Sequence, residues 1–91
     1  MKKAIITVVG QDSVGIIAGV CTFLADRKIN ILDISQTIVQ GYFNMMMVVD
    51  VSAVDADFLT VSDELSKMGQ EKLGVVARIQ REEIFDNMHR I

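Results

Sequence analysis

The sequence predicts an α+β fold of the ferredoxin-like type, with the element order β-α-β-β-α-β and a short C-terminal helix. Three observations carry this prediction. Four apolar, strand-like runs and two amphipathic helical runs follow one another in this order. Each helical run has one apolar stripe, so both helices must cover the same face of one sheet. The 91 residues, of which 51% are hydrophobic, suffice for one small domain, expected over residues 1–81, with the C-terminal helix over 82–91.

The first part of the chain supplies a strand, a helix and a second strand. Residues 3–9 are apolar and β-branched, which favours a strand that is buried on at least one face. Residues 14–27 are expected to form the first helix, and residues 29–39 the second strand. The apolar stripe of this helix repeats at helical spacing and consists of Ile16 or Ile17, Val20 and Leu24.

A hairpin is predicted at the centre of the chain. Gln40 and Gly41 suit a two-residue turn, because glycine readily supplies the positive φ that such turns require. Residues 42–51 then alternate with a period of two, as a strand with one buried face does. The buried face is expected to hold Phe43, Met45, Met47, Val49 and Val51.

The second helix is predicted over residues 55–71, with its end at Gly69 or Gly74. Its apolar stripe consists of Phe58, Val61, Leu65 and Met68. A fourth strand follows over residues 75–80. The final segment, residues 82–91, starts with acidic residues and has apolar residues at helical spacing, so we expect an amphipathic helix that serves as an interface.

The turn between the first strand and the first helix is the main candidate for function. Gly10 lets the strand end in a tight turn, and Asp12 or Ser13 can cap the helix. Gly15 is expected just inside the helix, where glycine costs roughly 0.5–1 kcal/mol relative to alanine. Close approach of a ligand or of another backbone would explain it. A well-capped turn with one tolerated glycine is the alternative.

Composition excludes several classes of protein. Nine basic and twelve acidic residues give a net charge of −3, which argues against nucleic-acid binding. No apolar run is long enough to span a membrane, and no signal-peptide pattern follows Lys2 and Lys3, so we expect a cytoplasmic protein. Cys21 is the single cysteine and His89 the single histidine, so no nucleophile–base pair can be assembled. We therefore expect no enzyme, no metal ion and no cofactor.

Two segments resemble the ACT domain family. Residues 10–17 read GQDSVGII and residues 24–31 read LADRKINI. The resemblance extends over residues 2–80 with the same element order. Val14 departs from the proline that is common before the motif glycine, and Lys28 departs from a common glycine. The chain looks like the stand-alone ACT proteins, similar to the glycine cleavage repressor branch, although that branch carries two ACT units and this chain has room for one.

The resemblance implies ligand binding rather than catalysis. ACT domains typically bind an amino acid or another small effector between paired domains and regulate amino-acid metabolism through a partner protein. Carried over by position, the ligand-binding residues are Gly10, Gln11, Asp12, Ser13, Val14, Gly15, Asn30 and Ile31. A homodimer is expected, joined edge to edge or face to face, with the C-terminal helix retained or exchanged between subunits. The alternative is an interaction module that dimerises or docks a protein and binds no small molecule.

Overall fold

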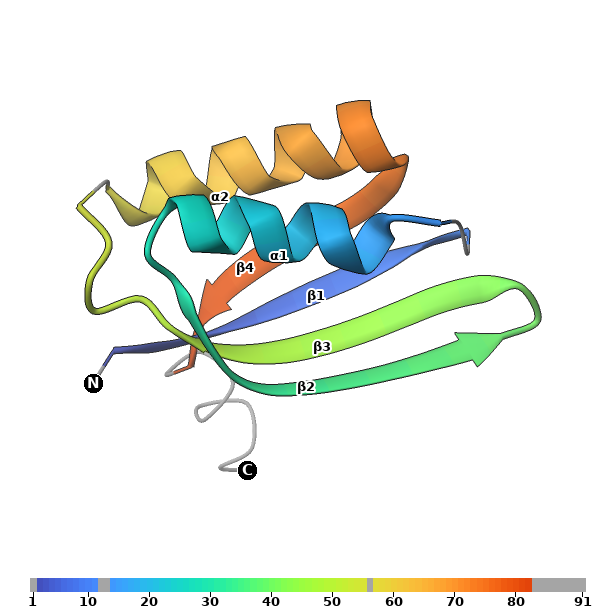
Figure 1. Ribbon diagram of the computed structural model, residues 1–91, viewed down its shortest axis with the longest axis horizontal. Coiled ribbons are helices and arrows are strands. Elements are labelled where there is room, and N and C mark those ends of the chain that lie inside the picture. The colour runs from blue at the N-terminus through green and yellow to red at the C-terminus, as the bar shows by residue number, and fades with distance from the viewer. Residues whose placement is uncertain (1, 12–13, 56, 83–91) are drawn as a thin grey trace, which may run out of the picture.

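The computed structural model describes residues 2–11, 14–55 and 57–82, which form a four-stranded sheet with two helices on one face (Figure 1). This arrangement confirms the predicted ferredoxin-like class. The predicted C-terminal helix lies outside the described residues. The elements are, in chain order, β1 (Lys3–Gln11), α1 (Ile16–Asp26), β2 (Asn30–Val39), β3 (Tyr42–Asp50), α2 (Phe58–Met68), η1 (Gly69–Leu73) and β4 (Val75–Arg81).

The strands lie in the order β2-β3-β1-β4, and all neighbours are antiparallel. β2 and β4 are therefore the two edges of the sheet. The pairing register fixes which residues lie side by side at each end of the three strands β1, β3 and β2. One end holds Lys3, Asp50 and Asn30, and the other end holds Gln11, Tyr42 and Val39.

The core lies between the sheet and the two helices. Alternate residues of β1, β3 and β4 face the helices, as the two-residue period of a strand requires. These strand residues are buried and comprise Ala4, Ile6, Val8, Phe43, Met45, Met47, Val49, Val75, Ala77 and Ile79. The helices contribute the predicted stripes, with Val20, Leu24, Val61 and Leu65 at 0–2% exposure. Among the described residues, no helix is long and apolar enough to cross a membrane.

The predicted hairpin is confirmed. Gln40 and Gly41 both have positive φ, 50° and 83°, as a two-residue turn with the twist of a hairpin requires. The turn fixes the register of β2 on β3, which is regular except for one irregularity between Ile31 and Asp33. β2 and β3 therefore form a long ribbon that extends beyond the helices (Figure 1).

The predictions for the first turn were partly wrong. α1 begins at Ile16 rather than at residue 14, and Gly15 is its N-cap, with φ 94° and ψ −1°. Gly15 is thus needed for a left-handed backbone conformation, which side chains with a Cβ rarely adopt. Gly10 remains within β1, and a Cβ there would lie 2.7 Å from Cγ1 of Val75. The predicted caps at Asp12 and Ser13 lie outside the described residues.

The second helix ends differently from a plain α-helix. α2 passes into a π-helical turn, η1, and the predicted end at Gly74 is confirmed, where φ is 67°. Gly69 is the C-cap of α2, as the alternative prediction had it, but its αR dihedrals, φ −60° and ψ −47°, continue the chain into η1. It is buried, and a Cβ there would lie 3.0 Å from Cβ of Ala77. The wider π turn keeps the chain in contact with β4 and places Leu73 beneath α1, where its Cδ2 would lie 2.8 Å from a Cβ at Gly19.

Candidate ligand-binding site

The turn from β1 to α1 is exposed at one end of the sheet. Gln11 ends β1, and Val14 and Gly15 lead into the helix with their side chains or backbone open to solvent. A Cβ built on Gly15 would have no heavy atom within 4 Å. The glycine therefore serves the backbone conformation and leaves open space beside the start of α1.

Among the described residues, no side chain caps the backbone donors at the N-terminus of α1. The first N–H groups of any α-helix lack intrahelical acceptors, and here the intrahelical ladder begins with Gly19 N–H donating to Gly15 O at 2.9 Å. The N-cap makes no side-chain hydrogen bond, and the first turn holds no acidic residue. These amides and the positive end of the helix dipole can hold a carboxylate or another small anion.

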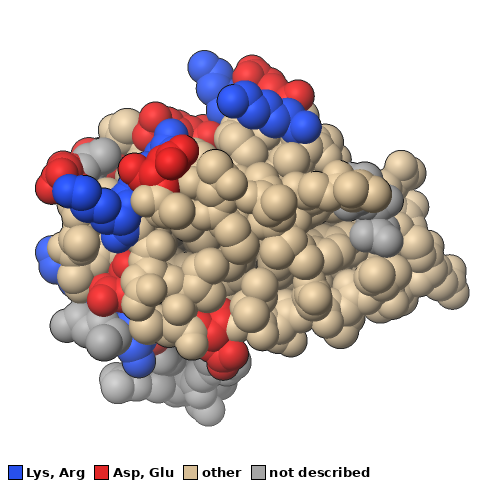
Figure 2. Space-filling view, in the orientation of Figure 1, with Lys and Arg blue, Asp and Glu red and all other residues tan. Residues whose placement is uncertain are grey.

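The described surface around this turn is uncharged. Figure 2 shows Lys, Arg, Asp and Glu gathered at the far end of the molecule and over α2 and η1, while the end with the β2–β3 hairpin and the start of α1 shows none in this view. Exposed apolar residues surround the turn instead, namely Val9, Val14, Ile38, Val39 and Tyr42. No described cation near the turn competes with the helix amides for an anion. The exposed apolar residues around the turn suit a ligand or a protein partner that carries apolar groups.

Asn30 and Ile31 lie at the other end of the sheet. Asn30 lies in the same row as Lys3. Lys3 is eight residue steps along β1 from Gln11, which amounts to roughly 26 Å. Within one chain, the structure therefore does not bring Asn30 and Ile31 to the turn. By register, Asn30 lies on the helix-free face, and Ile31 lies on the face of the helices.

Asp50 is the neighbour of Asn30 in the pairing register. Its carboxylate accepts hydrogen bonds from the hydroxyl of Ser52, at 2.5 Å, and from the backbone N–H of Ser52, at 2.9 Å. These hydrogen bonds, the side-chain one first, lower the pKa of Asp50 below its ordinary value because they favour the charged form. Within residues 2–11, 14–55 and 57–82, no group of three or more His, Cys, Asp or Glu side chains could hold a metal ion.

The edge strand β2 is a surface that the sequence reasoning did not single out. Every residue of β2 except Ile31 is exposed, because no helix covers the strand. A signal was present in the sequence. Ile34 and Ile38 alternate to one face and Val39 to the other, and Asp33 is the single charged residue of the strand. An exposed edge strand that carries apolar side chains and a single charge favours pairing with another strand.

Comparison with known proteins places this geometry in a family. A family model described as ACT domain matches residues 2–80. The chain is 60% identical to a UPF0237 protein of Bifidobacterium longum over 91 residues, which is 100% of both chains. It is also similar to an ACT domain protein from Streptococcus pneumoniae, with a TM-score of 0.82 and 47% identity, over 93% of this chain and 94% of that chain.

A more distant likeness concerns the fold alone. A formyltetrahydrofolate deformylase from Pseudomonas syringae matches with a TM-score of 0.79 and 23% identity, over 89% of this chain and 28% of that chain. The family model spans all six strands and helices of the predicted order, and the two segments that suggested the resemblance lie within it. The chain belongs to the ACT domain family and carries a single ACT domain.

Proposed function

We propose that this protein is a regulatory homodimer that binds a small effector, an amino acid in the first place, at the N-terminus of α1. The observation that carries the proposal is the exposed start of α1, where Gly15 provides no side-chain cap and the described surface is uncharged. The carboxylate of an amino acid would accept hydrogen bonds from the amides of the first turn. Asp12, which precedes this turn in the sequence, is the candidate partner for the ammonium group, with Gly10, Gln11, Ser13, Val14 and Gly15 around the guest.

The edge of β2 is the proposed dimer interface. The other edge strand, β4, is short and carries Arg78 and Arg81, and charged residues discourage pairing at an edge. Its residues on the helix side, Val75, Ala77 and Ile79, are buried against the helical layer of α2 and η1. β2 instead offers ten residues with a free edge and exposed Ile34, Ile38 and Val39. Pairing of two β2 strands would satisfy these backbone groups and bury apolar surface in one step.

Such pairing would complete the site. An antiparallel pairing centred on the middle of β2 would place Asn30 of the second copy beside Val39. Within one chain, Val39 of β2 is paired with Tyr42 of β3, and Tyr42 is paired with Gln11 of β1. Three strand spacings of about 4.8 Å then separate Asn30 of the second copy from Gln11, or about 14 Å in all. With a two-fold axis perpendicular to the sheet, Ile31 of the second copy faces the side on which α1 begins. Each site would therefore draw residues from both copies.

Through this dimer the effector would act on another protein. A guest held between two copies changes the stability of the pair, and a regulated protein that contacts the pair would sense that change. This partner and the effect on amino-acid metabolism are proposed from the membership of the ACT family. The second candidate function is a dimerising interaction module without a ligand, which the exposed β2 edge alone would also support.

Thermal unfolding against a panel of amino acids tests the effector. At ten times its Kd, a true effector is expected to raise the free energy of unfolding by about 1.4 kcal/mol. For a domain of this size each kcal/mol raises Tm by about 4–8 °C, so the effector would be evident. A panel without any shift, on a protein that remains dimeric, would favour the interaction module over the effector site.

Matched variants locate the effector. Ile17→Asp adds a negative charge to the first turn of α1 at an exposed position, so it should repel the carboxylate and abolish the shift while the helix dipole tolerates the charge. Leu59→Asp makes the same kind of change at the second residue of α2 and should leave the shift intact. Asn30→Ala should weaken the shift if the second copy contributes to the site. Retention of the shift in Ile17→Asp would place the effector elsewhere.

Sedimentation velocity at micromolar concentration tests the interface. Ile38→Lys introduces a charge on the β2 edge and is expected to convert the dimer to a monomer, because the pairing would bury an unpaired ammonium group. Val76→Lys is the control, since Val76 is exposed to a similar extent, 58% against 61%, but lies on β4. A dimer that persists in Ile38→Lys and dissociates in Val76→Lys would contradict the β2 interface.

A further inference from the structure

The helix-free face of the sheet carries an apolar row across its strands. Gln80, Ile5, Val48 and Asp33 are paired in sequence across β4, β1, β3 and β2. Ile5 is only 8% exposed and Val48 is half-buried, although no helix of the described residues covers this face. The next row contains Met46, which is 44% exposed. In these two rows the face is therefore apolar near its centre and polar at both margins.

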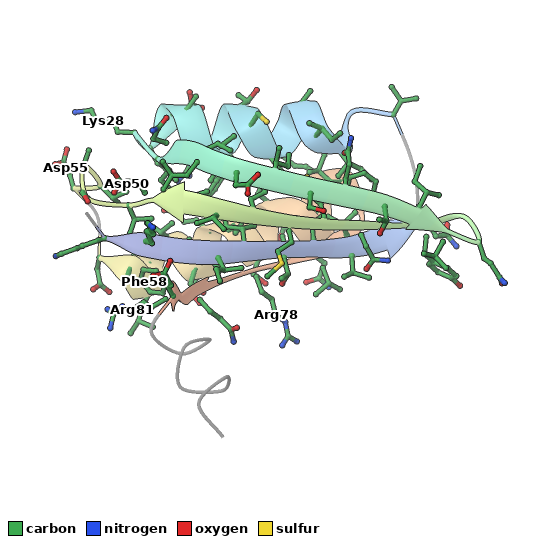
Figure 3. All side chains as sticks on the ribbon, turned by 90° about the horizontal axis from the view of Figure 1, so that it is seen from below. Lys28, Asp50, Asp55, Phe58, Arg78 and Arg81 are labelled. Atoms are coloured by element: carbon green, nitrogen blue, oxygen red, sulfur yellow. The ribbon has the colours of Figure 1, made fainter. Side chains whose placement is uncertain are left out.

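The two margins carry opposite charges. Arg78 lies on β4, and Asp33 lies on β2, both on the helix-free side by register. Figure 3 views this side of the sheet, with Arg78 labelled on β4 at one edge and Asp50 labelled toward the other. No described residue forms an ion pair with Arg78 or Asp33 across this face. A segment that crosses from β4 to β2 would meet a positive charge first and negative charges last.

The C-terminal sequence has the matching pattern. β4 ends at Arg81, which is paired with Ala4 and thus lies one residue from the row of Ile5. Nine residues follow Glu82, with the sequence EIFDNMHRI. Its acidic residues come first and Arg90 comes near the end. The apolar residues recur at helical spacing and are Ile84, Phe85, Met88 and Ile91.

The lengths also agree. Three strand spacings of about 4.8 Å make the sheet about 14 Å wide between its edge strands. Nine residues in an α-helix extend about 1.5 Å each, or about 14 Å in all. A helix that starts at the end of β4 can therefore reach β2, with its apolar side over the row of Ile5 and Val48.

We propose that residues 83–91 dock on the helix-free face of their own sheet and cross it from β4 to β2. The acidic Glu83 and Asp86 lie near Arg78 at the start, and Arg90 lies near Asp33 at the end. Phe85 and Met88 cover Ile5, Val48 and Met46. The docked segment converts the two-layer domain into three layers and leaves the edge of β2 free for pairing. This docking is independent of whether the protein binds an effector.

Methyl NMR on the full chain, with labelled methionine, isoleucine and valine methyl groups, tests the docking directly. We expect nuclear Overhauser effects from the Met88 methyl to the methyls of Met46, Val48 or Ile5. A sample that mixes labelled and unlabelled chains shows whether these effects arise within one chain or between two chains. If the effects appear only between differently labelled chains, the segment covers a second copy, and docking on the same chain is overturned. The absence of any effect also overturns the proposal.

Two full-length variants provide the controls. Phe85→Glu places a charge on the apolar side of the segment, so we expect loss of the Met88 contacts and a change in the Met46 methyl shift. Asn87→Glu places the same charge on the polar side and should leave both unchanged. Equal loss in both variants would show that charge, rather than apolar docking, governs the contact, and would contradict the proposed geometry.

Discussion

Leu65→Ala is expected to lower the free energy of unfolding by about 2–5 kcal/mol. Leu65 is 0% exposed and lies on α2 with its side chain against the sheet. Replacement of its isobutyl group by a methyl group forfeits apolar burial and leaves a cavity, and the close-packed layers on either side relax only in part. Chemical denaturation monitored by circular dichroism measures the loss. For a domain of 91 residues, this is a large share of the total stability.

Leu59→Ala is the matched control for this change. Leu59 lies in the same helix, but it is 70% exposed. The same substitution there should alter the free energy of unfolding by no more than about 0.5 kcal/mol. Similar losses at both positions would contradict the assignment of Leu65 to the core face of α2, because they would reflect helix propensity rather than burial.

Gly10→Ala is expected to lower the free energy of unfolding by about 1–3 kcal/mol through overpacking. A Cβ at this position would lie 2.7 Å from Cγ1 and 3.1 Å from Cα of Val75. Val75 is β-branched, so its side chain has little freedom to rotate away, and its Cα can move only if β4 shifts against β1. Thermal or chemical unfolding measures the effect, and Val75→Ala in the same chain should recover part of it.

Gly19→Ala separates overpacking from the mere presence of a methyl group. A Cβ at Gly19 would also meet an atom within 3.0 Å, but that atom is Cδ2 of Leu73, at 2.8 Å, and the end of a leucine side chain can rotate. Alanine also favours the helix by about 0.8–1.0 kcal/mol over glycine. We expect a near-neutral change at Gly19. A loss there as large as that at Gly10 would show that the contact with Leu73 is rigid.

The periodicity of the sequence predicted nearly all of the fold, because burial on one face imposes a readable pattern on each element. β3 shows this best, since alternation from Phe43 to Val49 specified both the strand and its buried face. Gln40 and Gly41 specified the hairpin because few residues adopt positive φ. The π-helical turn that begins at Gly69 was missed. The buried Gly69 packs closely on Ala77, and such a contact between distant parts of the chain has no local sequence pattern.

The candidate site was less predictable for the same reason. The sequence singled out Gly15 because it lies at the start of the predicted helix. Only the backbone shows that Gly15 is the N-cap of α1, with φ 94°, rather than a residue within the helix. Asn30 and Ile31 were grouped with this turn by resemblance, and the register places them at the opposite end of the sheet. Sequence carries local geometry well, whereas the proposed meeting of these two ends through a second copy would depend on assembly.

The unequal edges of the sheet also limit the size of any assembly. β2 is open to another strand, whereas β4 carries Arg78 and Arg81 and is sealed on its inner face by α2 and η1. In the proposed dimer, each chain would therefore add one strand, through β2. Two chains joined in this way would leave only their β4 strands as outer edges, where the arginines disfavour the addition of a third chain. An isologous pair of this kind would close at two copies instead of propagating into a fibre.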